Sequence, residues 1–215
     1  SSGLVVAFGA HRAETVRSGA RPARVALASF QLTPDVMWTA FPRETEDVFV
    51  TARLVNDTGS ALPAGETRVF VGPDYVGPLA LADWGMGETV RVGLGVDRQV
   101  EAEREALVVS KGTEGLFSKD TVHSRRYRVT VRNHRTREIT ARVLDQIPVS
   151  GDEKLEVKLT ESSAPQATLP TEEAETHAAR GVLEWRQAVA PGTAFDLRFG
   201  FEVRHPQGTG VVGLE

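Results

Sequence analysis

The side chains with the clearest chemical potential are three carboxylates that bracket the segment DQIPVSGDE. Asp145 opens this segment, and Asp152 and Glu153 close it. A glycoside hydrolase, or a site for a hard metal ion, needs such groups a few ångströms apart. In a structural role, Asp145 would end a strand by bonding turn amides while Asp152 and Glu153 lie in solvent. Nothing in the spacing shows that the groups converge, so we expect the structural role and keep a carboxylate-based hydrolase as an alternative.

Arginines around Tyr127 form the second feature that could do chemistry. Strand alternation puts Arg126, Arg128 and Arg132 on one outward face, where guanidinium groups could meet phosphate, sulfate or carboxylate groups. A solvated sheet face with cross-strand partners such as Glu138 predicts the same residues. Tyr127 is the aromatic residue among them and is expected to point inward, so stacking on nucleic acid bases is not expected.

Metal and cofactor motifs are missing from the sequence. The histidines are scattered without short ligand spacing, at His11, His123, His134, His177 and His205. There is no H-E-x-x-H or G-x-S-x-G motif, and a lone G-x-G at Gly93 and Gly95 lies within a strand pattern. Zero cysteines exclude disulfides and thiol nucleophiles. We therefore expect no catalytic residues, no cofactor and no metal.

The elements that must position these groups are β-strands. In Tyr127–Ser150, Val129 and Val131 alternate with polar residues, and after a polar break the alternation resumes, which predicts a β-hairpin with one buried face. A second hairpin is predicted across Pro191–Gly192, with Trp185 in the core, and Trp84 is expected to be partly exposed. Further strands are predicted at residues 4–8, 23–32, 36–41, 47–55, 67–71, 75–81, 88–96, 99–109 and 153–159, with a loop at 111–120.

Strands about ten residues apart, with Gly and Pro turns and no strong helix, predict an all-β fold, an antiparallel β-sandwich. A faint internal repeat, TARLVNDTGSAL around Asn56 and VTVRNHRTREIT around Asn133, indicates two tandem immunoglobulin-like units. We place them at residues 1–110 and 111–215. Residues 160–180, rich in Ser, Thr, Pro and Glu, are predicted to be a long mobile loop, although Thr171 to Gly181 could hold a turn of helix.

Composition limits the possible partners. The formal net charge of −4 gives no bulk attraction to nucleic acid or anionic lipid. No apolar run approaches the roughly 18 residues that a membrane-spanning helix needs. The start, SSGLVVAF, lacks the basic region and long apolar stretch of a signal peptide, and we expect a domain from a longer protein.

Four stretches carry a pattern more specific than strand periodicity requires. They are VFVTARLVNDTGSALPAGETRVFVGPDYVG (48–77), VGLGVDRQVEAERE (92–105), YRVTVRNH with ITARVLDQIPVSGDEKLEVKL (127–159) and GVLEWRQAVAPGTAFDLRFGFEVRHP (181–206). Together they resemble the C-terminal domain of the mucoidy inhibitor A family over nearly the whole chain. The resemblance implies a β-rich bacterial domain of unknown function that follows an N-terminal domain and a coiled coil. It implies an effect on exopolysaccharide production and brings no catalytic residues.

These observations together predict a non-catalytic binding or assembly module of a bacterial protein, connected with exopolysaccharide or the cell envelope. Its partner would be another protein or a second copy, bound at the free edges of its sheets. The first alternative is a domain that binds acidic polysaccharide through Arg126, Arg128 and Arg132. The second alternative is the carboxylate-based hydrolase. The compartment, cell envelope or cytoplasm, is not indicated by the residues.

Overall fold

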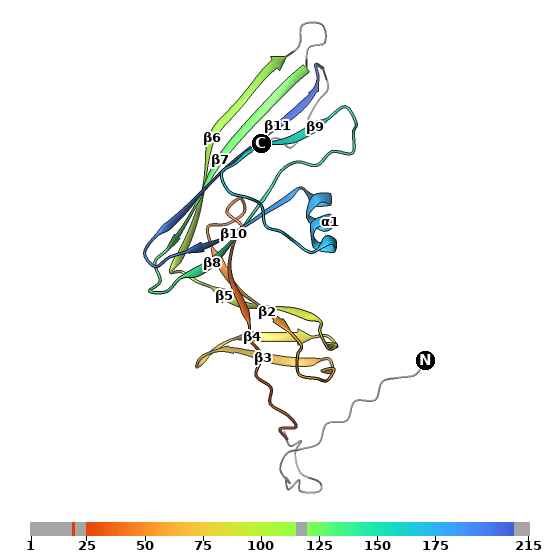
Figure 1. Cartoon of the computed structure of the whole chain (residues 1–215), viewed down its shortest axis with the longest axis vertical. Coiled ribbons are helices and arrows are strands. Elements are labelled where there is room, and N and C mark those ends of the chain that lie inside the picture. Colours follow the sequence, from red (N-terminus) through yellow and green to blue (C-terminus); the bar gives the residue numbers. More distant parts are fainter. Residues whose placement is uncertain (1–18, 20–24, 115–119, 209–215) are drawn as a thin grey trace, which may run out of the picture. The chain divides into compact units, whose positions relative to one another are not determined.

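The computed structural model describes residue 19 and residues 25–114 and 120–208 (Figure 1). The strand predicted at residues 4–8 lies outside these ranges. Residues 25–34 have no regular secondary structure, so the strand predicted at 23–32 is wrong for its described part. Its apolar side chains have no ladder partner there, and Leu27 and Phe30 are exposed.

The other predicted strands are present, some with shifted ends. They are β1 (Asp35–Ala40), β2 (Val48–Val55), β3 (Gly65–Val71), β4 (Asp74–Leu81), β5 (Thr89–Val96), β6 (Val100–Glu114), β7 (Asp120–Asn133), β8 (Ile139–Gln146), β9 (Glu156–Ser162), β10 (Val182–Val189) and β11 (Ala194–Pro206). The loop predicted at 111–120 is wrong at both ends, because β6 continues to Glu114 and β7 begins at Asp120.

The described strands form three sheets. The strand orders are β10-β8-β1-β2-β5, β6-β7-β11-β9 and β3-β4. The all-β fold with antiparallel sheets is confirmed, and within the five-stranded sheet β1 runs parallel to β8, with Trp38 beside Ala141. Side chains from both large sheets share one core, so the predicted sandwich packing is confirmed as well.

Both predicted hairpins are wrong in their pairing. β7 belongs to the four-stranded sheet while β8 belongs to the five-stranded sheet, and β11 and β10 are separated in the same way. The two chain segments therefore cross from one sheet to the other instead of folding back on themselves. The predicted alternation of buried and exposed residues in β7 and β8 is confirmed. Its apolar members are all buried: Val129, Val131, Ile139, Ala141 and Val143. Each strand buries the predicted face against the opposite sheet.

The centre of this core is aromatic. Trp185 of β10 lies 5.2 Å from Phe199 of β11 between ring centroids, and Tyr127 of β7 lies 5.5 Å from the same phenylalanine. The predictions that Trp185 lies in the core and that Tyr127 points inward are therefore confirmed. The indole N–H of Trp185 donates to the Ser162 hydroxyl at 3.0 Å, which satisfies its polar atom inside the core.

Asn133 and Asn56, one in each copy of the internal repeat, are buried and make corresponding hydrogen bonds. Asn133 Nδ2 donates to the carbonyl oxygens of Arg137 and Val189, and its Oδ1 accepts from the Arg135 amide. Its backbone N–H donates to the Thr193 carbonyl, and its own carbonyl accepts from Gly192. This arrangement holds the chain where it leaves β7 against the turn that begins β11.

Asn56 makes the same set of bonds after β2. Its Nδ2 donates to the carbonyls of Ser60 and Trp84, and its Oδ1 accepts from the Thr58 amide. Its backbone N–H donates to the Glu88 carbonyl and its own carbonyl accepts from the Gly87 amide, which matches the backbone bonds of Asn133. Trp84 is 7% exposed and donates its indole N–H to the Glu88 carbonyl, so the prediction that it is partly exposed is wrong. The hydrogen bonds of Trp84 with Asn56 and Glu88 hold it against the segment that follows β2, where its side chain is buried.

Residues 160–180 are not one long loop. Strand β9 continues to Ser162, and helix α1 spans Thr171–Arg180 beside β10 (Figure 1). Acidic residues in its first turn and basic residues in its last turn complement the helix dipole. Gly181 ends the helix with φ +67°, and a Cβ at this position would lie 2.2 Å from the Ile147 carbonyl oxygen. Glycine is therefore required there both by conformation and by space.

The chain divides into two compact units, each discontinuous in sequence. One unit comprises residues 1–35 and 52–94, and the other comprises 36–51 and 95–215. The predicted boundary between residues 110 and 111 falls inside β6. The immunoglobulin-like character of the units stays a prediction. Among the described residues, no helix has the length and apolar character to cross a bilayer.

Candidate functional site

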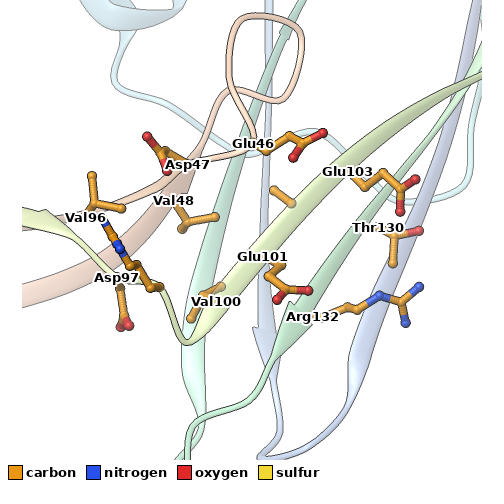
Figure 2. Close-up of a pocket in the computed structure, with 12 residues that line it drawn as sticks. Glu46, Asp47, Val48, Val96, Asp97, Val100, Glu101, Glu103, Thr130 and Arg132 are labelled. Atoms are coloured by element: carbon orange, nitrogen blue, oxygen red, sulfur yellow. The ribbon is translucent and has the colours of Figure 1, made fainter.

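A cleft of ≈ 510 Å³ lies beside the first residues of β6 (Figure 2). Its acidic side chains come from three places: the approach to β2, the end of β5 and the outward face of β6. They are Glu46, Asp47, Asp97, Glu101 and Glu103, and they face two basic residues, Arg98 and Arg132. Carboxylates therefore dominate the charge of this cleft.

Asp97 is held in place at the inner end of the cleft. Its carboxylate accepts hydrogen bonds from the Trp38 indole at 2.7 Å, from the Arg135 guanidinium and from the Gln99 amide at 3.0 Å. Partial burial raises the pKa of Asp97, but the bonds from Trp38, Gln99 and Arg135 outweigh it and hold that pKa below its ordinary value. Asp97 thus stays ionised and anchors the turn between β5 and β6.

The other carboxylates of the cleft reach solvent. Glu46, Asp47, Glu101 and Glu103 are exposed, and Glu101 lies 3.3 Å from His134 Nε2. In Figure 2, Glu101 and Arg132 stand side by side on neighbouring strands, in agreement with their cross-strand register. Apolar side chains of β2, β5 and β6 also line the cleft: Val48, Val96, Val100 and Ala102.

The cleft borders the edge of a sheet. β6 is the terminal strand of the four-stranded sheet, and in the described part of the chain it pairs with β7 alone. Its other side presents backbone N–H and C=O groups that no described strand uses. The free edge and the exposed carboxylates at alternate positions, Glu101 and Glu103, form a surface suited to an extended polypeptide.

The predicted arginine face exists, but its charge is largely compensated. Arg128 lies 3.3 Å from Glu105 on β6, and Arg126 lies 3.7 Å from Glu161 on β9. Arg132 stands opposite Glu101 and lines the acidic cleft. The outward direction of the three arginines is as predicted, while cross-strand acids give the sheet face a mixed charge. Their binding role stays a prediction.

Gly200 of β11 lets Arg126 and Glu161 meet across an intervening strand. A Cβ at Gly200 would lie 3.0 Å from Arg126 Cγ and 3.1 Å from Glu161 Cγ. A side chain there would push both residues away from the strand between them. This ion pair therefore depends on a glycine in the middle of a strand, where glycine otherwise weakens pairing.

The three predicted carboxylates have different environments. Asp145 is fully buried and accepts from Arg104 Nε at 2.9 Å and from Arg104 Nη2 at 3.4 Å. Burial raises the pKa of Asp145, while Arg104 and the Gln146 amide lower it in part. Asp152 and Glu153 are exposed, and Asp152 Oδ1 accepts from the Lys154 amide as a turn residue does. The expected exposure of Asp152 and Glu153 to solvent is confirmed.

The bond between Asp145 and Arg104 joins the two sheets. Arg104 comes from β6, and its guanidinium lies 3.5 Å from the ring centre of Tyr127. Asp145 comes from β8 in the opposite sheet. As expected, Asp145 accepts from a backbone amide at the end of its strand, that of Gln146 at 2.7 Å. The inter-sheet ion pair with Arg104 was not expected from the sequence.

A second buried carboxylate lies under α1. Glu184 of β10 accepts from Arg142 Nη2 at 2.6 Å and from Arg186 Nε at 2.7 Å. Burial raises the pKa of Glu184, but these two guanidinium groups outweigh burial and hold the pKa below its ordinary value. Glu173 and His177 of α1 complete the cluster, with His177 Nε2 at 3.3 Å from Glu184 Oε2. The helix is therefore attached to the sheet by charged contacts.

Two histidines meet between β7 and β11. His123 Nε2 and His205 Nε2 are 3.1 Å apart, and His205 Nδ1 lies 3.0 Å from the Pro206 carbonyl. Because a carbonyl only accepts, His205 Nδ1 carries the proton and its Nε2 accepts from His123. Burial lowers the pKa of His123, and the charges of His205, Lys111 and Arg125 lower it further.

Comparison with known proteins identifies the family. A family model described as Domain of unknown function (DUF4139) matches residues 1–207. The chain belongs to the DUF4139 family. Protein F37C4.5 of Caenorhabditis elegans is 22% identical over 210 residues, which are 96% of this chain and 38% of the worm protein. The chain thus spans well under two thirds of the length of this curated relative. No solved structure matches it.

Sequence reasoning missed the acidic cleft, the Glu184 cluster and the histidine pair of this DUF4139 chain. Each unites residues far apart in the sequence, as His123 and His205 are. One local signal was available: Glu173 and His177 are four residues apart, which is one turn of a helix. That signal acquires meaning only when α1 is known to be a helix and Glu184 is known to lie beneath it.

Proposed function

We propose that the protein is a non-catalytic binding module whose β6 edge takes up an extended, positively charged polypeptide segment. The observation that carries this proposal is the acidic cleft along that free edge. Strand addition supplies affinity through backbone hydrogen bonds, and side chains at alternate positions supply specificity.

The charge balance of the cleft favours a cationic partner. Asp97 is already neutralised by Arg135 and bonded to Trp38. The exposed Glu46, Asp47, Glu101 and Glu103 remain, against the two arginines of the cleft, and this leaves an excess of negative charge. Such complementarity raises the association rate and excludes acidic segments.

The apolar lining favours a segment with a two-residue repeat. Val96 is 43% exposed, whereas Val48, Val100 and Ala102 are buried in the core beneath the cleft surface. In a β-strand, successive side chains point to opposite sides. A segment that alternates lysine with valine would therefore present its lysines to the carboxylates and its valines to the side of the edge where Val96 is exposed.

A peptide titration tests this proposal. The probe is a short fluorescein-labelled peptide of alternating lysine and valine, followed by fluorescence anisotropy at low and physiological salt. We expect E101Q together with E103Q to weaken binding by about fivefold, because each exposed charge contributes roughly 0.2–1 kcal/mol. The matched control is E172Q with E175Q, which removes two exposed glutamates of α1 and should leave binding unchanged.

Two further probes separate strand addition from simple charge attraction. A peptide with N-methyl groups on alternate residues loses the donors of one edge and should bind much more weakly. A peptide of alternating glutamate and valine should not bind. Equal affinity of the wild-type chain and E101Q/E103Q for the lysine peptide would contradict the proposal.

The finer family assignment is also a proposal. The segments LGVD, DQIPVS and FGFEVRHP support a place in the mucoidy inhibitor A group, and hence a bacterial protein that affects exopolysaccharide or the cell envelope. We expect the full-length gene to restore normal exopolysaccharide yield in a bacterial strain lacking it. The same gene with E101Q and E103Q should not restore the yield if the β6 edge is the working surface.

Binding of acidic polysaccharide through Arg126, Arg128 and Arg132 is the competing proposal. The acidic neighbours of these arginines reduce the attraction of their face for a polyanion. Chromatography on immobilised polyuronate decides between the two. We expect weak retention that salt abolishes, and strong retention lost in R126A/R128A/R132A would favour the polysaccharide function instead.

A further inference from the structure

We propose that Glu173, His177 and Glu184 form a binding site for a divalent transition-metal ion, with Zn²⁺ as the best match. Among the described residues, this is the group of carboxylate and imidazole side chains whose ligand atoms all lie within 4.8 Å of one another. One histidine and two carboxylates are a ligand set that suits Zn²⁺, which accepts both nitrogen and oxygen.

The spacing of two ligand atoms agrees with tetrahedral coordination. His177 Nε2 and Glu184 Oε2 are 3.3 Å apart. Bonds of about 2.0–2.1 Å to a tetrahedral zinc ion place neighbouring ligand atoms roughly 3.3–3.4 Å apart. These two atoms can therefore hold the ion with little movement, and Glu173 completes the set from the preceding turn of α1.

The hydrogen bond at His177 Nδ1 leaves Nε2 as the ring nitrogen that faces Glu184. His177 Nδ1 lies 2.9 Å from the Glu173 carbonyl oxygen, which can only accept, so Nδ1 carries the hydrogen. In a neutral ring, Nε2 is then an acceptor that faces the acceptor Oε2 of Glu184. A metal ion between them resolves this conflict. A backbone carbonyl bonded to the second ring nitrogen is also the usual support of a metal-ligating histidine.

The arginines around Glu184 leave room for the ion. Arg186 uses Oε1 and Arg142 uses Oε2, and each carboxylate oxygen has a second lone pair for a metal. Arg142 also lies 3.6 Å from Glu173 Oε1, a contact that the metal would replace. Because two guanidinium groups oppose added positive charge, we expect affinity in the micromolar range and not the much tighter binding of structural zinc sites.

The site opens onto a cavity. A hollow of ≈ 300 Å³ has His177 and Glu184 in its wall, together with apolar residues such as Leu169 and Ile147. The three protein ligands leave one tetrahedral position for water or a small anion from this hollow. The proposal is independent of the function proposed for the β6 edge, which lies on other elements.

Isothermal titration of the full chain with ZnCl₂ tests the site. We expect saturable binding of one ion, at least tenfold weaker in H177A and in E173Q. H134A is the matched control, because His134 also has its Nε2 3.3 Å from a glutamate oxygen, and its affinity should be that of the wild-type chain. Thermal unfolding checks that each variant is folded, and zinc should raise the midpoint of the wild-type chain but not of H177A.

Each other outcome overturns the proposal. Without saturable binding, a proton on His177 Nε2 is the cation that joins it to Glu184. Equal affinity of H177A and the wild-type chain would mean that zinc binds elsewhere. Loss of binding in H123A instead would assign the zinc to the pair His123 and His205, whose Nε2 atoms are 3.1 Å apart.

Discussion

The ion pair between Arg104 and Asp145 gives the sharpest prediction about stability. Asp145 is 0% exposed and the Arg104 side chain is 18% exposed. The substitution R104M keeps the length and apolar stem of the side chain but removes the partner of a fully buried carboxylate. Removal of one partner from a buried pair costs about 3–5 kcal/mol. We expect R104M to lower the free energy of unfolding by that amount at neutral pH.

The loss in R104M should shrink in acid. Without Arg104, burial raises the pKa of Asp145 further, so the folded chain holds a proton that the unfolded chain releases. The pKa of Asp145 is already raised in the wild-type chain, so the stability of R104M relative to the wild-type chain falls as pH rises from the wild-type folded pKa to the higher folded pKa of the variant. The double variant R104M/D145L replaces both charges with apolar groups and should recover most of the loss, because a buried pair is often no better than well-packed apolar residues.

Urea unfolding monitored by circular dichroism measures these differences. R128M is the matched control, because Arg128 also pairs with a carboxylate, that of Glu105, but on the exposed face of the sheet. Such exposed pairs contribute about 0–1 kcal/mol to the free energy of unfolding. A cost of R104M no larger than that of R128M would refute the inter-sheet role of the pair. So would a double variant that is less stable than R104M.

Three further predictions concern four substitutions. N133A leaves buried carbonyls without donors and should lower the free energy of unfolding in urea by about 2–4 kcal/mol. An unchanged unfolding midpoint would mean that the Asn133 hydrogen bonds do not hold the end of β7 in place. G192A should lower the free energy of unfolding by about 1 kcal/mol, because alanine is strained at the positive φ of this position. G181A should lower it several times more, because the added Cβ would also meet the Ile147 carbonyl oxygen. Equal thermal midpoints of the two variants would refute this. The lowered pKa of His123 contributes stability above about pH 6.5 that is lost as pH falls through the folded pKa, so H123F should flatten the stability curve between about pH 7 and about pH 5.

Much of the fold could be predicted because strand periodicity is local. The positions of Val129, Val131 and Val143 indicate the buried face of β7 and β8, whichever strands pair with them. The pairing of those strands could not be predicted in the same way. A polar break such as that after Asn133 fits either a hairpin or a crossing between sheets, and the choice depends on the bonds that Asn133 makes with Val189, 56 residues away.

The candidate sites were harder to predict for a related reason. Arg126, Arg128 and Arg132 were placed on the correct face, but Glu161 was not foreseen beside them, since it belongs to a strand beyond Gly200. Helix α1 was considered at Thr171 to Gly181, but a loop was predicted instead, because the helix has no buried residue of its own. Its stability comes from Glu173 and His177 meeting charges on the sheet, and helix propensity alone does not reveal such contacts.

The sequence by itself determined most of the strands, their buried faces and the repeat around Asn56 and Asn133, because these follow from periodicity and from short-range bonds. Only the tertiary structure decided which strands share a sheet, that Asp145 meets Arg104, and that α1 brings a histidine and a glutamate to Glu184. Those contacts join residues that are distant along the chain, and they arise from the way in which two sheets and a helix bury their charged groups together.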